Sequence, residues 1–382
     1  MPHPGLADYL FVVYGTKAEK GYSELTSPCS KVIPHQKIDG VDFCIFARIN
    51  NKVKMKNVAI LAGGNSGEYE VSLRSGANIL DQLDRNLFNP YFIHVKGTEW
   101  SYTDEKNQKY QIDKNDFSLT IGNQKVIFDV VFIAIHGNPG ENGKFQGYFD
   151  MLDIPYTGCD CFCSALTFNK YFCNIAVREL KVPIAPSLHY YHDDKIDMDE
   201  IEKVCGYPCF IKSCNSGSSV GVTKVHNPSE VKAAVEEAFK YDNQLMIEKL
   251  VSGQELACGV AMVDGKPKAL AVTEICPKNE FYDYQAKYTD GFHDMYTPAR
   301  IPKESYEQVL KYSEQIYHFL NCGGIVRVDY IITPDGIPYF IEINTIPGQT
   351  AMSIIPAQLT ASGFELKDFY TSVVMDALKT KN

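Results

Sequence analysis

The sequence predicts an α/β protein built from more than one domain. From Met55 onward, short apolar runs typical of buried strands alternate with longer segments of helical period. A chain of 382 residues is long enough for two or three hydrophobic cores, and 45% hydrophobic with 22% charged residues is the content of an ordinary globular protein. Strands that alternate with helices in this way predict a mostly parallel first sheet, with ligands at the carboxyl ends of its strands.

Net charge and hydropathy argue against several classes of protein. A formal charge of −10 disfavours a general nucleic-acid binder, which needs a positive surface to displace counterions. No apolar run approaches the roughly 20 residues of a membrane span, and the apolar LFVVYG near the start has no basic region before it. We therefore expect no nucleic-acid partner, no membrane association and a cytoplasmic location.

Residues 1–54 differ from the rest of the chain. They mix prolines, glycines and isolated aromatic residues without a sustained period, whereas Met55 opens MKNVAILAGG, a buried-strand pattern with a glycine turn. We interpret residues 1–54 as an extension that is poorly ordered or that results from an upstream start. The alternative is a genuine extension with its own docking or binding role.

The first α/β domain is predicted over residues 55–158. Its glycine turn, GGNSGE, departs from the G-x-G-x-x-G fingerprint, which argues against a nicotinamide cofactor. Strands are expected over Val58–Leu61, Tyr91–Val95 and Asp129–Ile135, and helices over Glu68–Leu83 and residues 144–152.

Two further domains are predicted, over residues 159–250 and 251–382. The second begins with one long helical run, residues 164–180, and then has strands over residues 208–214 and 245–251 on either side of a helix over residues 229–241. The third has long strands between residues 255 and 275, a helix over Ser305–Leu320, a hairpin and a terminal helix.

The stretch VRVDYIITPDGIPYFIEIN predicts a β-hairpin near the end of the chain. A two-residue turn at its Asp-Gly dipeptide places Asp329 opposite Glu342 and Arg327 opposite Asn344. Because side chains alternate along a strand, these four share one face. The other face is expected to carry four apolar residues, Val326, Val328, Ile341 and Ile343.

The acidic face of this hairpin predicts a metal site. Two carboxylates that face each other across a strand pair repel unless a cation lies between them. The all-oxygen set of Asp329, Glu342 and Asn344 suits Mg²⁺, which keeps its other positions for water and phosphate oxygens. A salt-bridged exposed face, with Arg327 offsetting the acids, is the alternative.

Two segments carry signals for a phosphorylated ligand. The loop NSGSSVG follows Lys212, whose place in an apolar strand favours an anionic ligand over a simple flexible loop. In IEKLVSGQE, Glu248 and Lys249 end one strand and Glu255 starts the next, which is compatible with an adenine and ribose site or with a solvated crossover.

Two other segments are candidates for a site. The aromatic loop FYDYQAKY is expected to close over a ligand, with Lys287 and Tyr288 supplying a charge and a hydroxyl, unless it packs on a neighbouring domain. His136 follows a buried strand at the ligand edge of the sheet, where a functional role and a turn-capping role are both open.

The twelve cysteines show no disulfide-like spacing. Cys159, Cys161 and Cys163 form C-x-C-x-C, which could suggest zinc, but no nearby histidine or second cysteine pair completes a ligand set. We interpret them as reduced cysteines that act as small buried hydrophobic residues.

Taken together, the segments from about Met55 to the C-terminus resemble the D-alanine–D-alanine ligases, enzymes of the ATP-grasp type. The resemblance covers nothing in residues 1–54, and its strength is that eight modest motifs occur in one order. These are LAGGNSGEYEVSLRSG, AIHGNPGENGKFQG, LTFNK, FIKSCNSGSSVG, IEKLVSGQE, FYDYQAKY, RVDY and EINTIPGQTAMS.

The resemblance implies an ATP-grasp fold with an N-terminal parallel-sheet (pre-ATP-grasp) domain. It also implies a reaction in which ATP phosphorylates the carboxylate of one D-alanine and the amine of a second attacks the acylphosphate, for peptidoglycan precursor synthesis. The expected cofactors are ATP and two Mg²⁺ ions, for which Mn²⁺ can substitute, and the expected assembly is a homodimer.

Site residues follow from the positions that match the motifs of this family. The magnesium ligands are Asp329, Glu342 and Asn344. Lys170, Lys212 and Lys287 contact the nucleotide phosphates, and Glu248, Lys249, Val251 and Glu255 form the adenosine site. Glu68, supported by Ser218 and Tyr288, holds the first D-alanine, and His136 lies beside it. Arg327 and the Gly348 N–H stabilise the oxyanion, and Ser353 with Ile354 receives the second carboxylate. Asn142, Ser213 and Ile354 depart from the residues usual in the family, and these departures bear on fine substrate preference rather than on the reaction.

Two alternatives stay open. A D-alanine–D-lactate or D-alanine–D-serine ligase has the same frame, although FYDYQAKY with Tyr288 favours D-alanine as second substrate. A catalytically inactive nucleotide-binding scaffold is the alternative from another class. Such a scaffold has no need of Glu68, Arg327 or Ser353, all of which are present.

Overall fold

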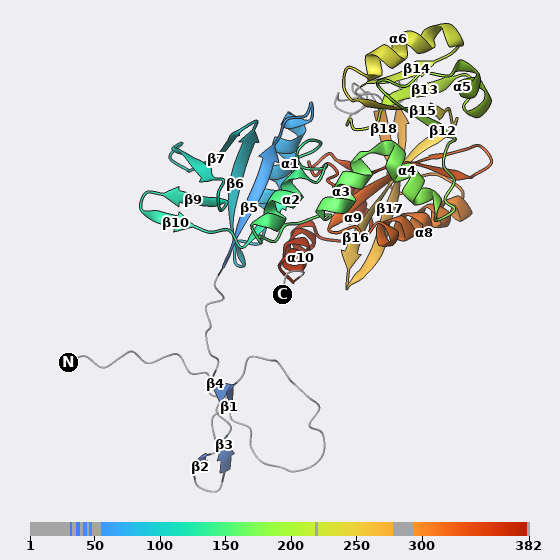
Figure 1. Ribbon diagram of the computed structural model, residues 1–382. Coiled ribbons are helices and arrows are strands. Elements are labelled where there is room, and N and C mark those ends of the chain that lie inside the picture. The colour runs from blue at the N-terminus through green and yellow to red at the C-terminus, as the bar shows by residue number, and fades with distance from the viewer. Residues whose placement is uncertain are drawn as a thin grey trace. The chain divides into compact units, whose positions relative to one another are not determined.

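The computed structural model describes residues 55–217, 221–277 and 293–379, together with four short strands between residues 31 and 47. The chain forms two compact units, residues 1–54 and 55–382. In the first unit, β1 (Lys31–Val32) pairs with β4 (Phe46–Ala47), and β2 (Gln36–Ile38) pairs with β3 (Val41–Phe43) (Figure 1). The interpretation of residues 1–54 as poorly ordered or as an upstream start otherwise lies outside the described residues.

The second unit begins with a seven-stranded sheet of order β10-β9-β8-β7-β6-β5-β11. The parallel sheet predicted from the sequence is confirmed for three of its strands, β5 (Lys56–Gly63), β6 (Phe88–Lys96) and β11 (Val130–Ile133). Helix α1 (Tyr69–Gln82) connects β5 to β6.

An antiparallel meander that the sequence analysis did not predict extends this sheet. Its strands are β7 (Glu99–Thr103), β8 (Lys109–Asp113), β9 (Ser118–Ile121) and β10 (Gln124–Val126). These short strands carry many polar residues because much of their surface is solvated, so they lack the apolar run of a buried parallel strand. "Mostly parallel" is therefore wrong for the sheet as a whole.

The single helical run expected over residues 164–180 is two helices. Helix α3 (Cys161–Phe168) ends at Asn169, and α4 (Lys170–Arg178) begins directly after it. The Asn169 side chain accepts a hydrogen bond from the Phe172 N–H at 3.1 Å and so caps α4. This break makes Lys170 the first residue of a helix. The preceding helix in the chain, α2 (Lys144–Met151), lies close to the range expected for it.

The central sheet is antiparallel, with the order β12-β15-β13-β14. Its strands are β12 (Ser187–Tyr191), β15 (Gln244–Lys249), β13 (Cys209–Ser213) and β14 (Val222–Val225). Helices α5 (Met198–Val204) and α6 (Pro228–Ala238) pack with one face of the sheet, where Cys209 and Ile211 are buried (Figure 1). Alternation along β13 directs Phe210 and Lys212 to the opposite face.

The C-terminal sheet has the order β18-β17-β16-β19-β20, and every neighbouring pair is antiparallel. Its strands are β18 (His293–Tyr296), β17 (Lys266–Pro277), β16 (Gln254–Val263), β19 (Ile325–Ile332) and β20 (Pro338–Asn344). Helix α8 (Lys303–Phe319) packs on the face that buries Cys258 and Val328.

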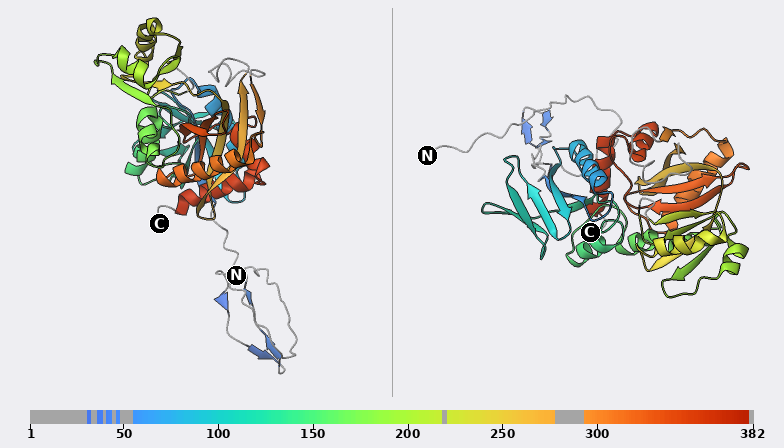
Figure 2. Two further views of the ribbon diagram at one scale, coloured as in Figure 1. Left: turned by 90° about the vertical axis from the view of Figure 1, so that its right-hand side faces the viewer. Right: turned by 90° about the horizontal axis from the view of Figure 1, so that it is seen from above.

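Helices α9 (Ile354–Ala361) and α10 (Leu366–Lys379) follow the C-terminal sheet. The red α10 returns to the N-terminal sheet, as Figures 1 and 2 show, and its Tyr370 ring lies edge-on to Phe132 at 6.1 Å between centroids. The first and last segments of the second unit therefore share one hydrophobic core. No helix in the described part of the chain is long and apolar enough to cross a membrane.

The β19–β20 hairpin has the predicted pairing of its acids but not the predicted turn. The loop is longer than two residues: Thr333 N–H donates to the Ile337 carbonyl at 3.0 Å, and Gly336 has φ of +84°. A β-bulge between Asp329 and Tyr330 on one strand then shifts the register, so that Asp329 still pairs with Glu342.

The bulge also changes the position of Ile341. We expected it on the buried apolar face with Ile343, and that expectation is wrong. Phe340 pairs with Tyr330 and is fully buried, whereas Ile341 is the extra residue and lines a cavity together with Glu342. The longer loop and the bulge offset each other, which is why the simple count placed the acids correctly.

Candidate active site

A cavity of about 370 Å³ lies between the central and C-terminal sheets. Eight of its lining residues were predicted from the sequence to bind nucleotide or metal: Lys170, Lys212, Glu248, Lys249, Val251, Glu255, Asp329 and Glu342. Apolar side chains complete the wall, among them Phe210, Leu256, Ile275, Ile331 and Ile341. A largely apolar cavity with a few charged groups is typical of a small-molecule site.

Lys212 and Glu248 form a buried ion pair in the central wall. They lie on the neighbouring strands β13 and β15, and Lys212 Nζ is 2.7 Å from Glu248 Oε2. Their side chains are 9% and 5% exposed, and Asn174 Nδ2 donates to Glu248 Oε1 at 3.3 Å. Breaking such a pair leaves an uncompensated buried charge, so each partner fixes the position of the other.

Lys170 lies beside the serine-rich loop because of the cap at Asn169. Its backbone N–H donates to the Cys214 carbonyl at 3.1 Å, and its ammonium donates to the Ser216 carbonyl. Asn215 is held by Asp242, whose Oδ2 accepts from both its backbone N–H and its side-chain amide at 2.8 Å. These contacts fix the first half of the loop beside Lys170, which lines the cavity. The prediction for Ser218 lies outside the described residues.

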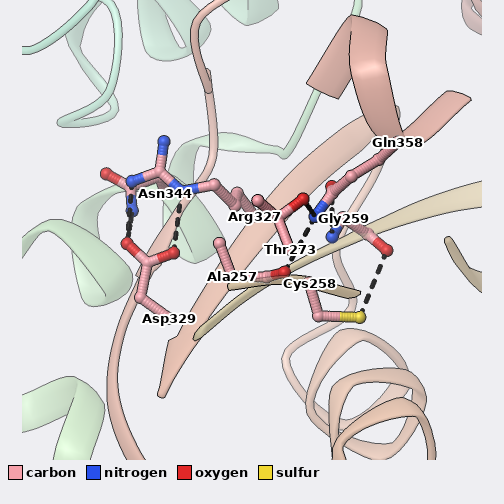
Figure 3. Close-up of polar contacts among 8 residues, drawn as sticks. All are labelled: Ala257, Cys258, Gly259, Thr273, Arg327, Asp329, Asn344 and Gln358. Carbon is pink, nitrogen blue, oxygen red and sulfur yellow. Dashed lines mark hydrogen bonds and ion pairs between the residues drawn. The ribbon is translucent and has the colours of Figure 1, made fainter. Parts of the chain in front are cut away.

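The acidic face of the hairpin is occupied by an arginine clamp. Arg327 Nε and Nη2 donate to the two oxygens of Asp329 at 2.7 Å each, and Asn344 Nδ2 donates to Oδ2 at 3.0 Å, as Figure 3 shows. Asp329 and Glu342 line the cavity, whereas Arg327 and Asn344 reach it through Asp329. The arrangement combines both sequence hypotheses, since the paired acids face the cavity and Arg327 offsets one of them.

Gln358 fixes helix α9 onto the C-terminal sheet. Its amide donates to the Ala257 carbonyl at 2.8 Å and to Thr273 Oγ1 at 3.0 Å, while its oxygen accepts from Gly259 N–H at 2.9 Å (Figure 3). A Cβ at Gly259 would come within 2.6 Å of the Gln358 oxygen, so a larger residue at this irregular point of β16 would displace the Gln358 amide.

Ser353 immediately precedes α9, and the Gln358 contacts therefore help to position it. Its hydroxyl lies 2.7 Å from Thr350 Oγ1 and accepts from Thr350 N–H at 3.1 Å. A Cβ at Gly348 would come within 2.9 Å of Ser353 Oγ, so these two predicted site residues are in close contact.

The loop after β20, residues 345–350, is held by the N-terminal domain. His136 Nδ1 donates to the Ile346 carbonyl at 2.7 Å, because a carbonyl can only accept. Its Nε2 lies 2.9 Å from Ser75 Oγ, which accepts from Gln349 N–H at 3.1 Å. Burial lowers the pKa of His136, in keeping with a neutral ring that accepts the Ser75 proton. His136 is therefore a connecting residue between domains.

Glu141 completes this anchoring, and the sequence analysis did not single it out. Its two carboxylate oxygens accept from Gly137 N–H at 2.7 Å and from Ile346 N–H at 3.1 Å. Burial, together with the negative charge of Glu68, raises its pKa to about 8, although the two N–H donors favour the charged form. The sequence feature that could have indicated Glu141 is its place as the acid within the glycine-rich motif AIHGNPGENGKFQG.

Glu68 lies where the N-terminal domain meets the serine-rich loop. It directly precedes α1, and its Oε2 would be 3.1 Å from a Cβ at Gly217 and 3.6 Å from a Cβ at Gly137. The predicted residues Lys287 and Tyr288 lie outside the described residues, like Ser218. The described candidates therefore form two neighbouring groups, one around the cavity and one around loop 345–350.

A cavity between two antiparallel sheets, lined by lysines and carboxylates and preceded by a parallel-stranded domain, defines the chain as an enzyme of the ATP-grasp class. The family models described as "D-ala D-ala ligase N-terminus" and "D-ala D-ala ligase C-terminus" match residues 57–159 and 177–375. The chain belongs to the D-alanine–D-alanine ligase family.

Curated relatives agree with this assignment. D-alanine–D-alanine ligase of Parabacteroides distasonis is 42% identical over 326 residues, which is 85% of this chain and 98% of the relative. That of Flavobacterium johnsoniae is 41% identical over 84% of this chain and 98% of the relative. All of these alignments span nearly the whole relative.

Solved structures of similar fold include enzymes with different second substrates. The VanG D-Ala:D-Ser ligase from Enterococcus faecalis has a TM-score of 0.77 and 32% identity, covering 85% of this chain and 100% of its own. The Bacillus anthracis D-alanine–D-alanine ligase complexed with ATP has a TM-score of 0.69 and 28% identity, covering 86% and 98%.

Proposed function

We propose that this protein joins two D-alanines into D-alanyl-D-alanine with conversion of ATP to ADP and phosphate, for peptidoglycan precursor synthesis. The observation that carries the proposal is the cavity between the two sheets, where the buried Lys212–Glu248 pair faces the Asp329 and Glu342 carboxylates. The family membership of the chain supports the same reaction.

The cavity is proposed to bind ATP between the domains predicted over residues 159–250 and 251–382. Lys170 and Lys212 would contact the phosphates, together with Lys287. Lys249 donates its backbone N–H to the Pro186 carbonyl at 2.9 Å, so its own carbonyl is the main-chain group it can offer to the adenine amino group. Glu248, Val251 and Glu255, which line the same cavity, would complete the adenosine site.

The oxygen donors of the hairpin fit a divalent cation. Asp329, Glu342 and Asn344 would hold two Mg²⁺ ions, or Mn²⁺ in their place, and the bound ions would neutralise charge on the phosphate oxygens. The fit rests on two facing carboxylates that line the cavity, although Asp329 currently accepts two bonds from Arg327. Ion binding would therefore require Arg327 to share or release Asp329.

The amino-acid substrates are proposed to lie beside loop 345–350. Glu68, with Ser218 and Tyr288, would hold the first D-alanine ammonium near His136. Arg327 and the Gly348 N–H would donate to the oxyanion of the tetrahedral intermediate. Ser353 would receive the carboxylate of the second D-alanine, and its contact with Gly348 supports adjacent positions for these two groups.

The chemistry takes place in two steps. A carboxylate oxygen of the first D-alanine attacks the γ-phosphorus and ADP leaves. The neutral amine of the second D-alanine then attacks the acyl carbon, and phosphate leaves as the amine proton is lost. Positioned lysines stabilise the phosphoryl oxygens, and exclusion of water protects the acylphosphate from hydrolysis.

Three further features are part of the proposal. We infer a cytoplasmic enzyme whose partners are D-alanine and ATP, without nucleic acid or membrane, and which assembles as a homodimer.

D-Lactate or D-serine as second substrate is the alternative, for which the D-Ala:D-Ser ligase of similar fold is a precedent. An inactive nucleotide-binding scaffold is the alternative from another class.

The test is ADP release by the purified protein with Mg²⁺-ATP, followed by mass analysis of the product. D-Alanine should stimulate release and yield D-alanyl-D-alanine, whereas L-alanine should not. D-Lactate and D-serine, each mixed with D-alanine, test the second site. Their incorporation would contradict the assignment of Tyr288 and leave the ATP-dependent chemistry intact. Absence of ADP release from folded protein would favour the scaffold.

A matched pair of variants tests the role of Glu68. Glu68→Gln removes the charge proposed to hold the ammonium, and dipeptide synthesis should be almost abolished with the fold intact. Glu70→Gln changes an exposed acid in the first turn of the same helix and should retain wild-type turnover. Equal turnover in both variants would defeat the assignment.

A further inference from the structure

Three buried cysteine sulfurs from two distant segments lie together outside the candidate active site. Cys159 precedes α3, Cys163 lies in its first turn, and Cys322 follows α8. Their sulfurs all lie within 4.8 Å of one another, and the Cys163 and Cys322 sulfurs are 3.7 Å apart. All three are free thiols and are at most 6% exposed.

The two segments are in direct backbone contact, which fixes the sulfurs. A Cβ at Gly324 would come within 2.9 Å of the Gly158 backbone, and a Cβ at Gly323 would collide with the Gly158 carbonyl. Asp160 Oδ1 accepts from Cys163 N–H at 2.7 Å and so sets the start of α3. Tyr317 donates to the Gly324 carbonyl at 3.0 Å and holds the other segment.

The distance between the Cys163 and Cys322 sulfurs matches that of two thiolates on one metal ion, and the third sulfur lies within 4.8 Å of both. Zinc–sulfur bonds of about 2.3 Å at tetrahedral angles place two sulfurs about 3.8 Å apart. The distance of 3.7 Å between Cys163 and Cys322 is close to this value and far from a disulfide bond. Gly323 N–H points at the Cys159 sulfur at 3.4 Å and would stabilise a thiolate there.

We propose that Cys159, Cys163 and Cys322 form a three-thiolate site for Zn²⁺ that joins the start of α3 to the end of α8. Thiolates select thiophilic ions such as Zn²⁺ and Cu⁺. Zn²⁺ leaves one net negative charge on three thiolates, against two for Cu⁺, and buried charge is costly. Binding releases the protons of the three thiols.

The C-x-C-x-C pattern did not predict this set of three cysteines, because it includes Cys161 and lacks Cys322. Cys161, the middle residue of C-x-C-x-C, donates to the Gly143 carbonyl at 3.2 Å and is not in the cluster. Cys322 is 159 residues away from Cys163 in the chain and takes its place. Cys161 is therefore a matched control within the same motif.

The experiment uses full-length protein, reduced and freed of metal with a chelator, and Co²⁺ as the spectroscopic probe. With excess Mg²⁺ present to occupy the carboxylate site, wild type should bind one Co²⁺ per chain with a thiolate-to-cobalt charge-transfer band, which Zn²⁺ abolishes by displacement. Cys322→Ser should lose the band, and Cys161→Ser should keep it. Asp329→Asn should also keep it, since a carboxylate site gives no such band.

Metal-dependent stability is the second readout. In excess Mg²⁺, which occupies the carboxylate site, Zn²⁺ should raise the Tm of wild type and of Cys161→Ser but not of Cys322→Ser or Cys322→Ala, because an ion that binds the folded state stabilises it. The two Cys322 variants guard against a failure to fold, which the Tm without metal reveals. A missing band in reduced wild type, or an equal band in Cys322→Ser, would overturn the proposal.

Discussion

The two halves of the candidate site are held by different kinds of interaction. Around the cavity, charged groups are paired, as in Lys212 with Glu248 and Arg327 with Asp329. Loop 345–350 is instead held mainly by hydrogen bonds between its backbone and two side chains of the N-terminal domain: His136 donates to the Ile346 carbonyl, and Glu141 accepts from the Ile346 N–H. Ion pairs therefore hold the side chains around the cavity, whereas hydrogen bonds to the backbone hold loop 345–350.

This difference separates two roles: the charged groups around the cavity stabilise charge on a ligand, and the hydrogen bonds to loop 345–350 fix the position of that loop. In an ion pair such as Arg327–Asp329, each residue can replace its partner with a ligand group of the same charge as that partner, because both residues then still face an opposite charge. The hydrogen bond that the Ile346 N–H donates to Glu141 has no such substitute, and its loss moves the loop. We therefore expect changes around the cavity to affect phosphate chemistry, and changes around the loop to affect alignment of the amino acids.

Lys212→Met should have the largest effect. It removes a cation proposed to contact the phosphates and leaves Glu248 buried without its partner, which costs about 3–5 kcal/mol of stability. Turnover should fall about 10³-fold. Urea unfolding and ADP release measure the two losses.

The control for this variant is Lys240→Met, which breaks an exposed lysine–glutamate pair with Glu237. Exposed pairs contribute at most about 1 kcal/mol, so both stability and turnover should stay near wild type. Similar losses in the two variants would contradict the importance of burial at Lys212.

Glu141→Ala tests the other half of the comparison. It leaves the Gly137 and Ile346 N–H groups without their acceptor, and we expect kcat to fall about 100-fold through misalignment of loop 345–350. The KM for ATP should stay unchanged, because Glu141 does not line the cavity. Steady-state kinetics with each substrate varied separates the two constants, with the exposed Glu105→Ala as control. A raised KM for ATP with unchanged kcat would contradict the proposed separation of roles between the cavity and loop 345–350.

Glu274→Gln should have the smallest effect, and one that depends on pH. Glu274 is buried, and hydrogen bonds from Arg300 lower its pKa to about 2. Because the pKa of Glu274 is lower in the folded state, the group stabilises that state at pH values above 4.5, its ordinary pKa. This stabilisation is lost as the pH falls from 4.5 toward 2.

The matching measurement is the urea midpoint of wild type and Glu274→Gln between pH 6 and pH 3. The wild type should lose roughly 1–3 kcal/mol more than the variant over this range, because only the wild type must protonate Glu274. Parallel pH profiles would show that the Arg300 pair contributes nothing to stability.

Local sequence determined which charged side chains face the cavity. The lysine in the apolar strand at Lys212 and the acids at Asp329 and Glu342 could be placed on their faces because a strand alternates with period two. The ordered motifs gave the family, and the family models confirm it. The predictions for Ser218, Lys287 and Tyr288 stay predictions.

Only the tertiary structure decided which distant groups meet. The bulge at Ile341, the anchoring of Ile346 by Glu141 and the approach of Cys322 to Cys163 join segments far apart in the chain or depend on packing at a single residue. Periodicity reports only which face a side chain occupies. The partner across that face is set by how whole sheets and helices pack, and a single sequence carries no local signal for that contact.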